Sequence, residues 1–388
     1  MKERYRLLGD FIQPVDERNK ELKVDYLLGV SISKQFIPSI ANIVGTDLSN
    51  YKIVRTGQFA YGPVTSRNGE KISIALLRDK DCIISSSYTV FEVTDNERLD
   101  PEYLMLWFSR PEFDRYTRYM SHGSVREIFD WDELCKVELP VPSIEKQRGI
   151  VTAYNTITDR IELKRKINDN LEATAQAVFQ EQFASFYGAD ELPDGYRIIN
   201  LDNLCTVKGG KRLPADCKLL DTPTDHPYIR VRDVGSNRYV CLTNQFQYID
   251  EETYSAISRY IVNTGDIVIS IVGTIGLLGK IHSSLDKANL TENCVKLANI
   301  HTVTSDYLYY TLCYKKQIKE IDLLTVGAVQ AKLPMYNIQS MKILVPPTKA
   351  IEAFQRKMNV LNEQIEANTV EIQKLYELEE VLLAKLSD

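Results

Sequence analysis

The glycines between Gly273 and Lys280 form the first pattern with chemical meaning, because a phosphate-binding loop is built from glycines followed by a lysine. The spacing does not fit such a loop, since five residues rather than four separate Gly273 from Gly279. Ile281 also stands where a Ser or Thr would have to ligate Mg²⁺. A glycine-rich turn after a buried strand is therefore the better interpretation of this segment.

Other catalytic patterns are missing from the sequence. It contains no G-x-G-x-x-G, no G-x-S-x-G, no H-E-x-x-H and no Asn-Pro-Pro-aromatic tetrapeptide of the kind that amino-methyltransferases carry. Asp130 and Asp132 lie close together, but no spacing marks them as a general acid and base, so we expect solvated surface there. The four histidines lie far apart along the chain and give a metal site little to build on. The sequence thus offers no recognisable catalytic, nucleotide-binding or metal-binding motif.

Positive charge is concentrated locally in a chain that is acidic overall. The 388 residues include 47 Lys and Arg against 53 Asp and Glu, a net charge of −6 that excludes a uniformly basic nucleic-acid binder. Basic residues and glycines gather around Lys71 in the first half and between Lys208 and Arg212 in the second, and Arg230, Arg232 and Arg238 follow with nearby tyrosines. Such patches suit phosphates and guanine edges, although a solvated face is the usual role of a charge run.

The cysteines and the apolar segments indicate the cellular compartment of the protein. Seven cysteines without a C-x-x-C pair suit a reducing compartment better than a disulfide framework. The start of the chain is charged and lacks the apolar core of a signal peptide, and the most apolar stretch, Ile267 to Gly279, is too short to span a bilayer. We expect a cytoplasmic protein.

An internal repeat organises the whole chain. A shift of 204 residues aligns Gly123-Ser124-Val125 with Gly327-Ala328-Val329, and Leu139-Pro140-Val141-Pro142 with Ile343-Leu344-Val345-Pro346. Farther upstream the shift becomes 208, where Val54-Arg55-Thr56-Gly57 matches Val262-Asn263-Thr264-Gly265. Tyr5-Arg6 weakly resembles Tyr196-Arg197. The chain is thus two copies of one unit, which a pseudo-two-fold axis can relate.

Each copy closes with a segment whose apolar residues follow the 4-3 spacing of a heptad seam. The seam positions are Ile150, Tyr154, Ile157, Ile161 and Leu171 in the first copy, and Phe354, Met358, Leu361, Ile365 and Leu375 in the second. Polar Lys164 and Asn168 interrupt the first seam and Asn368 the second, which fixes register at a cost in stability. We expect two helices on the order of 50 Å long, packed on each other within the chain; packing on their own domains is the alternative.

The portion ahead of each long helix reads as an α+β globule. Short β-rich runs at Lys71–Leu76 and Cys82–Val93 match runs at Ile267–Val272 and Cys294–Leu297, and a helix is predicted in each copy, at Pro101–Phe108 and at Ser305–Tyr314. Leu192-Pro193-Asp194-Gly195 is the turn between the copies. The predicted boundaries are a globule at 1–140, a helix at 141–190, a second globule at 191–342 and a second helix at 343–388.

This arrangement resembles the specificity (S) subunit of type I restriction-modification enzymes over essentially the whole chain. The resemblance is carried by Gly123-Ser124-Val125-Arg126, by Leu139-Pro140-Val141-Pro142-Ser143-Ile144-Glu145-Lys146-Gln147 and by Leu192-Pro193-Asp194-Gly195-Tyr196. In the second copy the Leu-Pro-x-Pro motif is reduced to Val345-Pro346-Pro347, with Glu352 and Gln355 displaced.

The resemblance implies that each globule is a target recognition domain reading one half of a split DNA sequence. The helices would pair antiparallel as a spacer between the half-sites. The S subunit has no active site and binds no cofactor; it recruits two methyltransferase (M) subunits that bind S-adenosylmethionine and methylate adenine, and restriction (R) subunits that use ATP and Mg²⁺. The residues then expected to contact double-stranded DNA are Arg67, Lys71, Ser124, Arg126, Lys208, Lys211, Arg212, Thr274, Lys280 and Gln330.

Two other classes of function stay open at this point. One is a protein-assembly scaffold in which the repeat and the coiled coil matter and DNA does not, which the acidic net charge mildly supports. The other is a DNA-modifying enzyme with a divergent site, which the missing cofactor motifs oppose.

Overall fold

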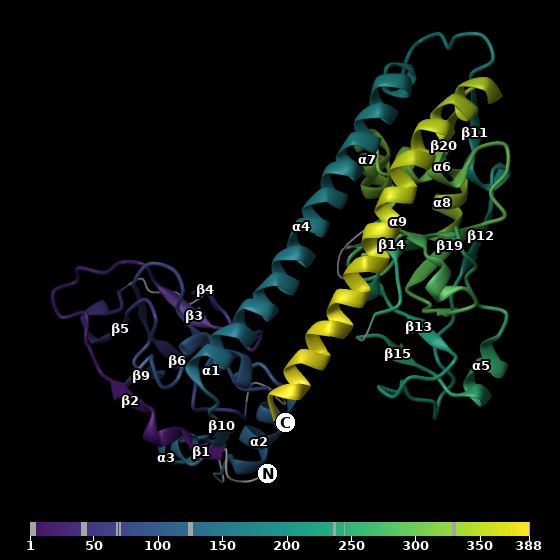
Figure 1. Ribbon diagram of the computed structural model, residues 1–388. Coiled ribbons are helices and arrows are strands. Elements are labelled where there is room, and N and C mark those ends of the chain that lie inside the picture. The colour runs from purple at the N-terminus through teal and green to yellow at the C-terminus, as the bar shows by residue number, and fades with distance from the viewer. Residues whose placement is uncertain are drawn as a thin grey trace. The chain divides into compact units, whose positions relative to one another are not determined.

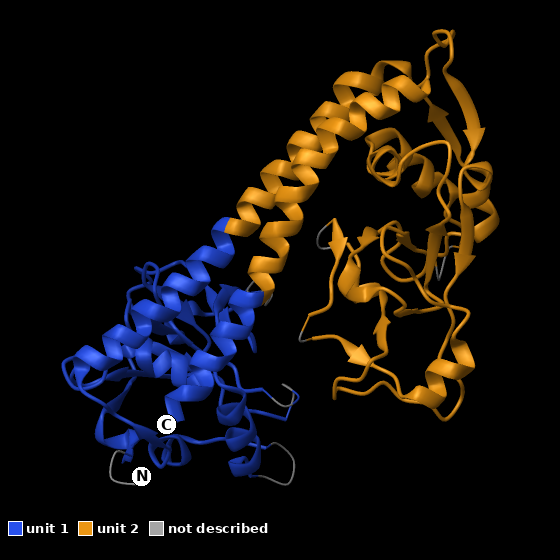
Figure 2. Ribbon diagram, turned by 45° about the vertical axis from the view of Figure 1, so that its right-hand side comes forward, with its two compact units in different colours: residues 1–163, 374–388 blue, residues 164–373 orange. Residues whose placement is uncertain are grey.

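The chain divides into two compact units, and each contains one α+β globule and part of both long helices. The computed structural model describes residues 5–39, 45–66, 69, 71–122, 127–235, 238–243, 245–327 and 331–387. Unit 1 comprises Met1–Leu163 and Lys374–Asp388, and unit 2 comprises Lys164–Gln373 (Figure 2). Both long helices therefore cross from one unit into the other.

The first globule is built on a four-stranded antiparallel sheet in the order β2-β9-β6-β7. Phe59 on β6 stacks on Phe91 of β9, with ring centroids 4.9 Å apart, so large apolar side chains from neighbouring strands fill the core. The elements ahead of the first long helix are β1 (Tyr5–Leu7), η2 (Leu8–Asp10), β2 (Ile12–Val15), β3 (Leu28–Val30), β4 (Phe36–Pro38), η3 (Leu48–Asn50), β5 (Lys52–Val54), β6 (Phe59–Tyr61), β7 (Ile74–Leu76), β8 (Cys82–Ile84), β9 (Thr89–Val93), α1 (Pro101–Phe108), α2 (Pro111–Met120), α3 (Trp131–Cys135) and β10 (Glu138–Pro140).

The second globule repeats that sheet as β12-β19-β16-β17 and adds β14, which runs parallel to β17. Every residue of β16 is buried, which explains why this strand reads as a continuous apolar run. Its elements are η4 (Ala184–Phe186), β11 (Arg197–Asn200), η5 (Leu201–Asn203), β12 (Thr206–Gly209), β13 (Pro227–Ile229), η6 (Val231–Asp233), β14 (Tyr239–Val240), β15 (Gln247–Tyr248), α5 (Glu251–Ile257), β16 (Ile267–Ser270), β17 (Leu278–Ile281), η7 (Ser283–Leu285), β18 (Asn289–Leu290), β19 (Cys294–Ala298), α6 (Ser305–Leu312), α7 (Lys315–Leu324), α8 (Met335–Ser340) and β20 (Lys342–Val345).

Equivalent helices α1 and α6 are fixed in the same way in both globules. Each begins behind a capping side chain, Asp100 for α1 and Thr304 for α6, which accepts a backbone hydrogen bond from the first turn. The hydroxyl of Tyr103 then donates to the Pro140 carbonyl at 3.0 Å, and that of Tyr307 donates to the Leu344 carbonyl at 2.7 Å. Both donors and both acceptors differ by the repeat shift of 204, so the repeat extends to single buried hydrogen bonds.

Two expected matches within the repeat are wrong. In the first sheet β6 lies between β9 and β7, and in the second sheet β16 lies between β19 and β17, so β16 is the counterpart of β6. Ile267–Val272 therefore does not correspond to Lys71–Leu76. Composition could not separate these neighbouring apolar strands. Near the N-terminus, Arg6 pairs with Leu139, and in the second copy Ile199 pairs with Ile343. Because Leu139 and Ile343 are equivalent in the repeat, the counterpart of Arg6 is Ile199 and not Arg197.

The two long helices, α4 (Ile144–Phe183) and α9 (Thr348–Ala384, followed by η8 at Lys385–Ser387), run antiparallel (Figure 1). In unit 1 the Tyr154 hydroxyl near the start of α4 donates to Glu379 near the end of α9, at 2.5 Å. In unit 2 the rings of Phe183 and Phe354 lie 5.5 Å apart, at the opposite ends of the two helices. The predicted fold class, two repeated α+β globules with an antiparallel pair of long helices, is confirmed.

The expected seam residues lie along this helix pair. Those that are buried are Ile157, Ile161, Phe354, Met358 and Ile365, and those that are half-buried are Ile150, Tyr154, Leu171, Leu361 and Leu375. The apolar stripes of α4 and α9 are thus withdrawn from water.

The polar interruption of the seam is a closed hydrogen-bonded group. Asn368, with 1% of its surface exposed, accepts from the Lys164 ammonium at 2.9 Å and donates to the Asn168 carbonyl oxygen at 2.8 Å. Lys164 also pairs with Glu371 at 2.9 Å. Lys164 and Asn368 are 204 residues apart, so they are equivalent in the repeat. Equivalent residues meet only at a two-fold axis, and the local axis of the helix pair therefore passes here.

Replacing Asn368 with Leu should destabilise the protein, because Lys164 and Asn168 lose a buried partner. We expect a fall of about 1–3 kcal/mol in the free energy of unfolding, measured by denaturant unfolding of the purified chain. Asn170→Leu, an exposed position on α4, is the matched control and should change stability by no more than about 0.5 kcal/mol. A stabilised N368L would show that the polar group is not needed to hold this register.

Candidate nucleic-acid interface

In each globule, isolated β-bridges join the loop of one β-hairpin to a later segment of the chain. The bridges occupy equivalent positions in the two globules. In unit 1, Ile128 bridges both Val64, in the β6–β7 loop, and His122. In unit 2, Lys332 bridges both Val272, in the β16–β17 loop, and Val326. We call each of these paired segments a hairpin edge. Its described residues are 62–66, 69 and 71–73 with 122, 127 and 128 in unit 1, and 271–277 with 326, 327, 331 and 332 in unit 2.

Two of the residues expected to contact DNA lie in the described part of the hairpin edges. Lys71 lies in the β6–β7 loop and Thr274 in the β16–β17 loop, and both are exposed. Arg67, Ser124, Arg126 and Gln330 belong to the same stretches of sequence but fall outside the described residues. Lys71 and Thr274 come from different halves of the sequence, and the strand order shows that they occupy corresponding loops.

Glycines shape the second hairpin edge. Gly273 and Gly276 have φ angles of 81° and 80°, in the left-handed region that a residue with a side chain rarely adopts. The Ser270 hydroxyl donates to the Thr274 carbonyl at 2.6 Å and accepts from the Leu277 amide at 2.9 Å, so one buried side chain closes the loop. This confirms the interpretation of the segment as a glycine-rich turn after a buried strand.

The basic segment from Lys208 to Arg212 lies next to this edge. The Lys211 amide donates to the Leu290 carbonyl at 2.8 Å and the Gly210 amide to that of Cys294 at 3.0 Å, while the Ile271 amide donates to Asn293 at 2.8 Å. A Cβ at Gly210 would lie 2.1 Å from the Thr291 carbonyl oxygen, so only glycine fits there. The 290–294 segment therefore accepts hydrogen bonds both from the basic segment and from Ile271 of the hairpin edge.

The basic side chains of that segment remain accessible. Lys208, Lys211 and Arg212 are all exposed, and the Arg212 side chain keeps 81% of its surface while it pairs with Glu292 at 2.7 Å. An ion pair with that exposure contributes little stability, so its arginine can exchange Glu292 for a phosphate at small cost.

Lys280 occupies a different environment and leaves the set of candidate DNA-contacting residues. Its side chain keeps only 13% of its surface, and its ammonium lies 2.6 Å from Asp306. Arg238, which sequence analysis grouped with a basic cluster, is 3% exposed and pairs with the same carboxylate. Burial alone would raise the pKa of Asp306, but the two cations lower it to about 2. The ion pairs therefore stabilise the fold above the ordinary pKa near 3.8, and this contribution disappears as the pH falls toward 2.

Gln147 explains the Leu-Pro-x-Pro-x-x-Glu-x-Gln motif at the start of α4. Its side chain is fully buried; its Oε1 accepts from the Asp100 amide at 2.8 Å, and its Nε2 donates to the carbonyls of Arg98 at 3.0 Å and Pro142 at 2.8 Å. The residue that makes the motif recognisable thus joins the long helix to the globule. The motif alone does not predict this role for Gln147.

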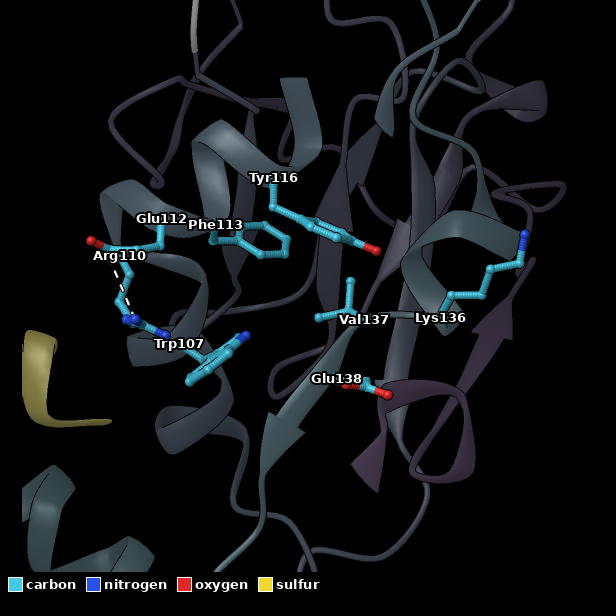
Figure 3. Close-up of a pocket in the computed structure, with 8 residues that line it drawn as sticks. All are labelled: Trp107, Arg110, Glu112, Phe113, Tyr116, Lys136, Val137 and Glu138. Carbon is cyan, nitrogen blue, oxygen red and sulfur yellow. Dashed lines mark ion pairs between the residues drawn. The ribbon is translucent and has the colours of Figure 1, made fainter. Parts of the chain in front are cut away.

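A cleft of about 400 Å³ in the first globule lies beside Arg110 (Figure 3). The guanidinium of Arg110 stacks 4.2 Å from the Trp107 ring, lies 3.5 Å from Glu112 and donates to the Ser387 hydroxyl at the end of η8. The Tyr5 hydroxyl also reaches the Ser387 carbonyl, at 2.8 Å. These contacts anchor the end of the second long helix.

Among the residues that the structure describes, no group of three or more His, Cys, Asp and Glu side chains is placed to hold a metal ion. No helix in the same residues is both long and apolar enough to cross a membrane.

Comparison with known proteins gives one consistent family. The family model described as "Type I restriction modification DNA specificity domain" matches residues 41–173 and again residues 193–381. The MjaIX specificity subunit of a type I restriction enzyme from Methanocaldococcus jannaschii is 24% identical over 305 residues, 74% of this chain and 68% of that protein. The HindI specificity subunit from Haemophilus influenzae is 21% identical over 421 residues, 89% of each chain.

A solved structure supports the fold. The type I restriction-modification S subunit from M. genitalium has a TM-score of 0.53 at 15% identity and covers 99% of this chain and 96% of that one. The two matches to the family model, one in each half, account for the repeat, and they do not favour the scaffold alternative. The chain belongs to the family of type I restriction-modification DNA specificity domains and carries two copies of that domain.

Proposed function

We propose that this chain is the sequence-reading subunit of a type I restriction-modification system, and that each hairpin edge reads one half of a split DNA target. The observation that carries the proposal is the match of both halves to a DNA specificity domain, together with the same hairpin edge in both. Exposed cations beside the second edge supply contacts to phosphates or bases. The DNA-contacting set proposed here is Arg67, Lys71, Ser124, Arg126, Lys208, Lys211, Arg212, Thr274 and Gln330.

The paired helices suit the role of a spacer between half-sites. The 40 residues of α4 extend about 60 Å at 1.5 Å per residue. That length corresponds to roughly 17 base pairs of B-form DNA. The buried polar group around Asn368 holds α4 and α9 in one register, and a fixed register is what a molecular ruler needs.

The chemistry in this proposal belongs to partner subunits. The chain would recruit two methyltransferase subunits, which bind S-adenosylmethionine and methylate adenine, and restriction subunits that use ATP and Mg²⁺. The similarity of the chain to proteins named specificity subunits supports a non-catalytic role. It would act in the cytoplasm, where bacterial and archaeal DNA lies.

Genomic DNA from cells that express this chain with its neighbouring methyltransferase should carry a split adenine-methylated motif. Single-molecule sequencing would reveal both half-sites and the spacer between them. The matched control is the methyltransferase expressed alone, which should leave the motif unmethylated. A stable complex of the two proteins that adds no motif would contradict the proposal.

Arg212→Ala should weaken DNA binding through the second half-site. We expect about a tenfold loss of affinity, or about 1.4 kcal/mol, and a salt dependence reduced by about one phosphate contact. Binding of the assembled complex to the mapped duplex, titrated at several salt concentrations, measures both. Arg197→Ala removes the same charge from β11, away from the hairpin edge, and should leave affinity and salt slope unchanged. Equal behaviour of the two variants would remove Arg212 from the proposed contacts.

Lengthening both helices together should lengthen the spacer. Four residues inserted after Asn170 in α4 and after Asn362 in α9 lie at the same level of the antiparallel pair. They add about 6 Å, equivalent to about two base pairs of DNA. The methylated motif should then show a spacer about two base pairs longer. An insertion in α4 alone is the control, because it breaks the seam register and should destabilise the chain. An unchanged spacer in the double insertion would refute the ruler.

A further inference from the structure

A buried ion network in unit 2 joins the second globule to both long helices. It consists of Glu172 on α4, Arg238 before β14, Lys280 on β17, Asp306 on α6, and Asn362 on α9. Arg238 lies at its centre: its side chain keeps 1% of its surface and donates to Asp306 and Asn362. A Glu172 oxygen lies 3.7 Å from the guanidinium.

The carboxylate of Asp306 has a complete set of partners. One oxygen accepts from Lys280 at 2.6 Å and from Arg238, and the other accepts from Asn362 at 2.7 Å and from Gln355 at 2.6 Å. The Tyr310 hydroxyl accepts from Arg238 at 2.9 Å and donates to Glu172 at 2.9 Å. Glu172 Oε1, Arg238 Nε and Gln355 Oε1 are buried without a hydrogen bond. The directional contacts that the other atoms make are satisfied only when α4, α6 and α9 keep their relative positions.

The same network reaches the hairpin edge through the backbone. The Lys280 amide donates to the Arg238 carbonyl at 2.7 Å, and β14 and β17 pair in parallel immediately afterwards. β17 begins at Leu278, directly after the loop that contains Thr274. A displacement of the Arg238 segment against the helices is therefore transmitted to the loop proposed to read DNA.

The first globule has a different arrangement at the corresponding place. Glu102 is the repeat counterpart of Asp306, and it pairs with Arg78 at 2.5 Å. The Arg78 side chain keeps 52% of its surface and that of Glu102 keeps 35%, so this pair is exposed to water and holds little energy. The two equivalent carboxylates are thus paired with arginines from different elements, one pair exposed and one buried.

We infer that Arg238 is a positioning residue that holds the second recognition domain at a fixed place on the helix pair, and so sets how strictly the spacer length is read. The inference rests on the function proposed above and adds an asymmetry to it. Only the second domain is held in this way within the described residues, so loss of the network relaxes the second half-site and leaves the first half-site unchanged.

The test compares methylation by the assembled complex on duplexes that carry the mapped motif with its natural spacer, or with one base pair removed or added. For Arg238→Met, the ratio of the rate at the natural spacer to the rates at the altered spacers should fall at least tenfold. Arg238→Lys keeps the charge without the planar fork and should recover part of that ratio. Arg78→Met, the matched control from the first domain, should change the ratio less than twofold.

Two milder variants keep the test decisive if R238M does not fold. Glu172→Gln removes the charge that faces Arg238 from α4, and Asn362→Leu removes the contact from α9. Each should lower the ratio severalfold. Unchanged spacer discrimination in the folded variants would overturn the inference, and so would an equal loss of rate at every spacer, which a purely structural role predicts. A wild-type complex that methylates no split motif would instead contradict the proposed function.

Discussion

The register of the antiparallel helix pair is the constraint on which the rest of this structure depends. α4 and α9 each contribute residues to both compact units. A slip of one helix along the other would therefore disturb both globules at once. The Leu386 side chain, just beyond α9, is buried in the core of unit 1, while Phe354 near the start of α9 is buried in unit 2. The two ends of α9 thus complete the cores of different globules.

Apolar burial and polar pairing make different contributions to this register. Ile161, Ile365 and their neighbours supply the stability of the seam, but an apolar stripe tolerates slips by one heptad. The polar group around Asn368 does not tolerate such a slip, because the Lys164 ammonium and an amide would then be buried without partners. In the same way, the ion network around Arg238 requires one position of the second globule against the helices. Polar groups inside this protein therefore specify position more than they add stability.

The sequence was sufficient for the features that depend on periodicity. The heptad spacing and the 204-residue shift predicted two long helices that pair with each other, because both patterns extend over many residues. Local composition was not sufficient where two neighbouring strands look alike, so β6 and β7 were confused as counterparts of β16. Burial of charge was equally hidden: Lys208 and Lys280 are both lysines beside glycines, yet one is exposed and the other is paired with Asp306. That difference depends on Asp306, which is 26 residues farther along the chain from Lys280.

The construction of the hairpin edges shows how such a chain can change its target without changing its fold. The bridges Val64 to Ile128 and Val272 to Lys332 are made by backbone groups, which every residue except proline can provide. Among the described residues of these loops, Lys71 and Thr274 are exposed, whereas Gln147, Arg238 and Asn368 hold the globules and helices from buried positions. Under the proposed function, a substitution at Thr274 or Lys71 changes what the edge presents to DNA at small cost in stability. A substitution at Arg238 changes where the edge is held. The proposal therefore divides specificity into two components, the bases that are read and the distance at which they are read.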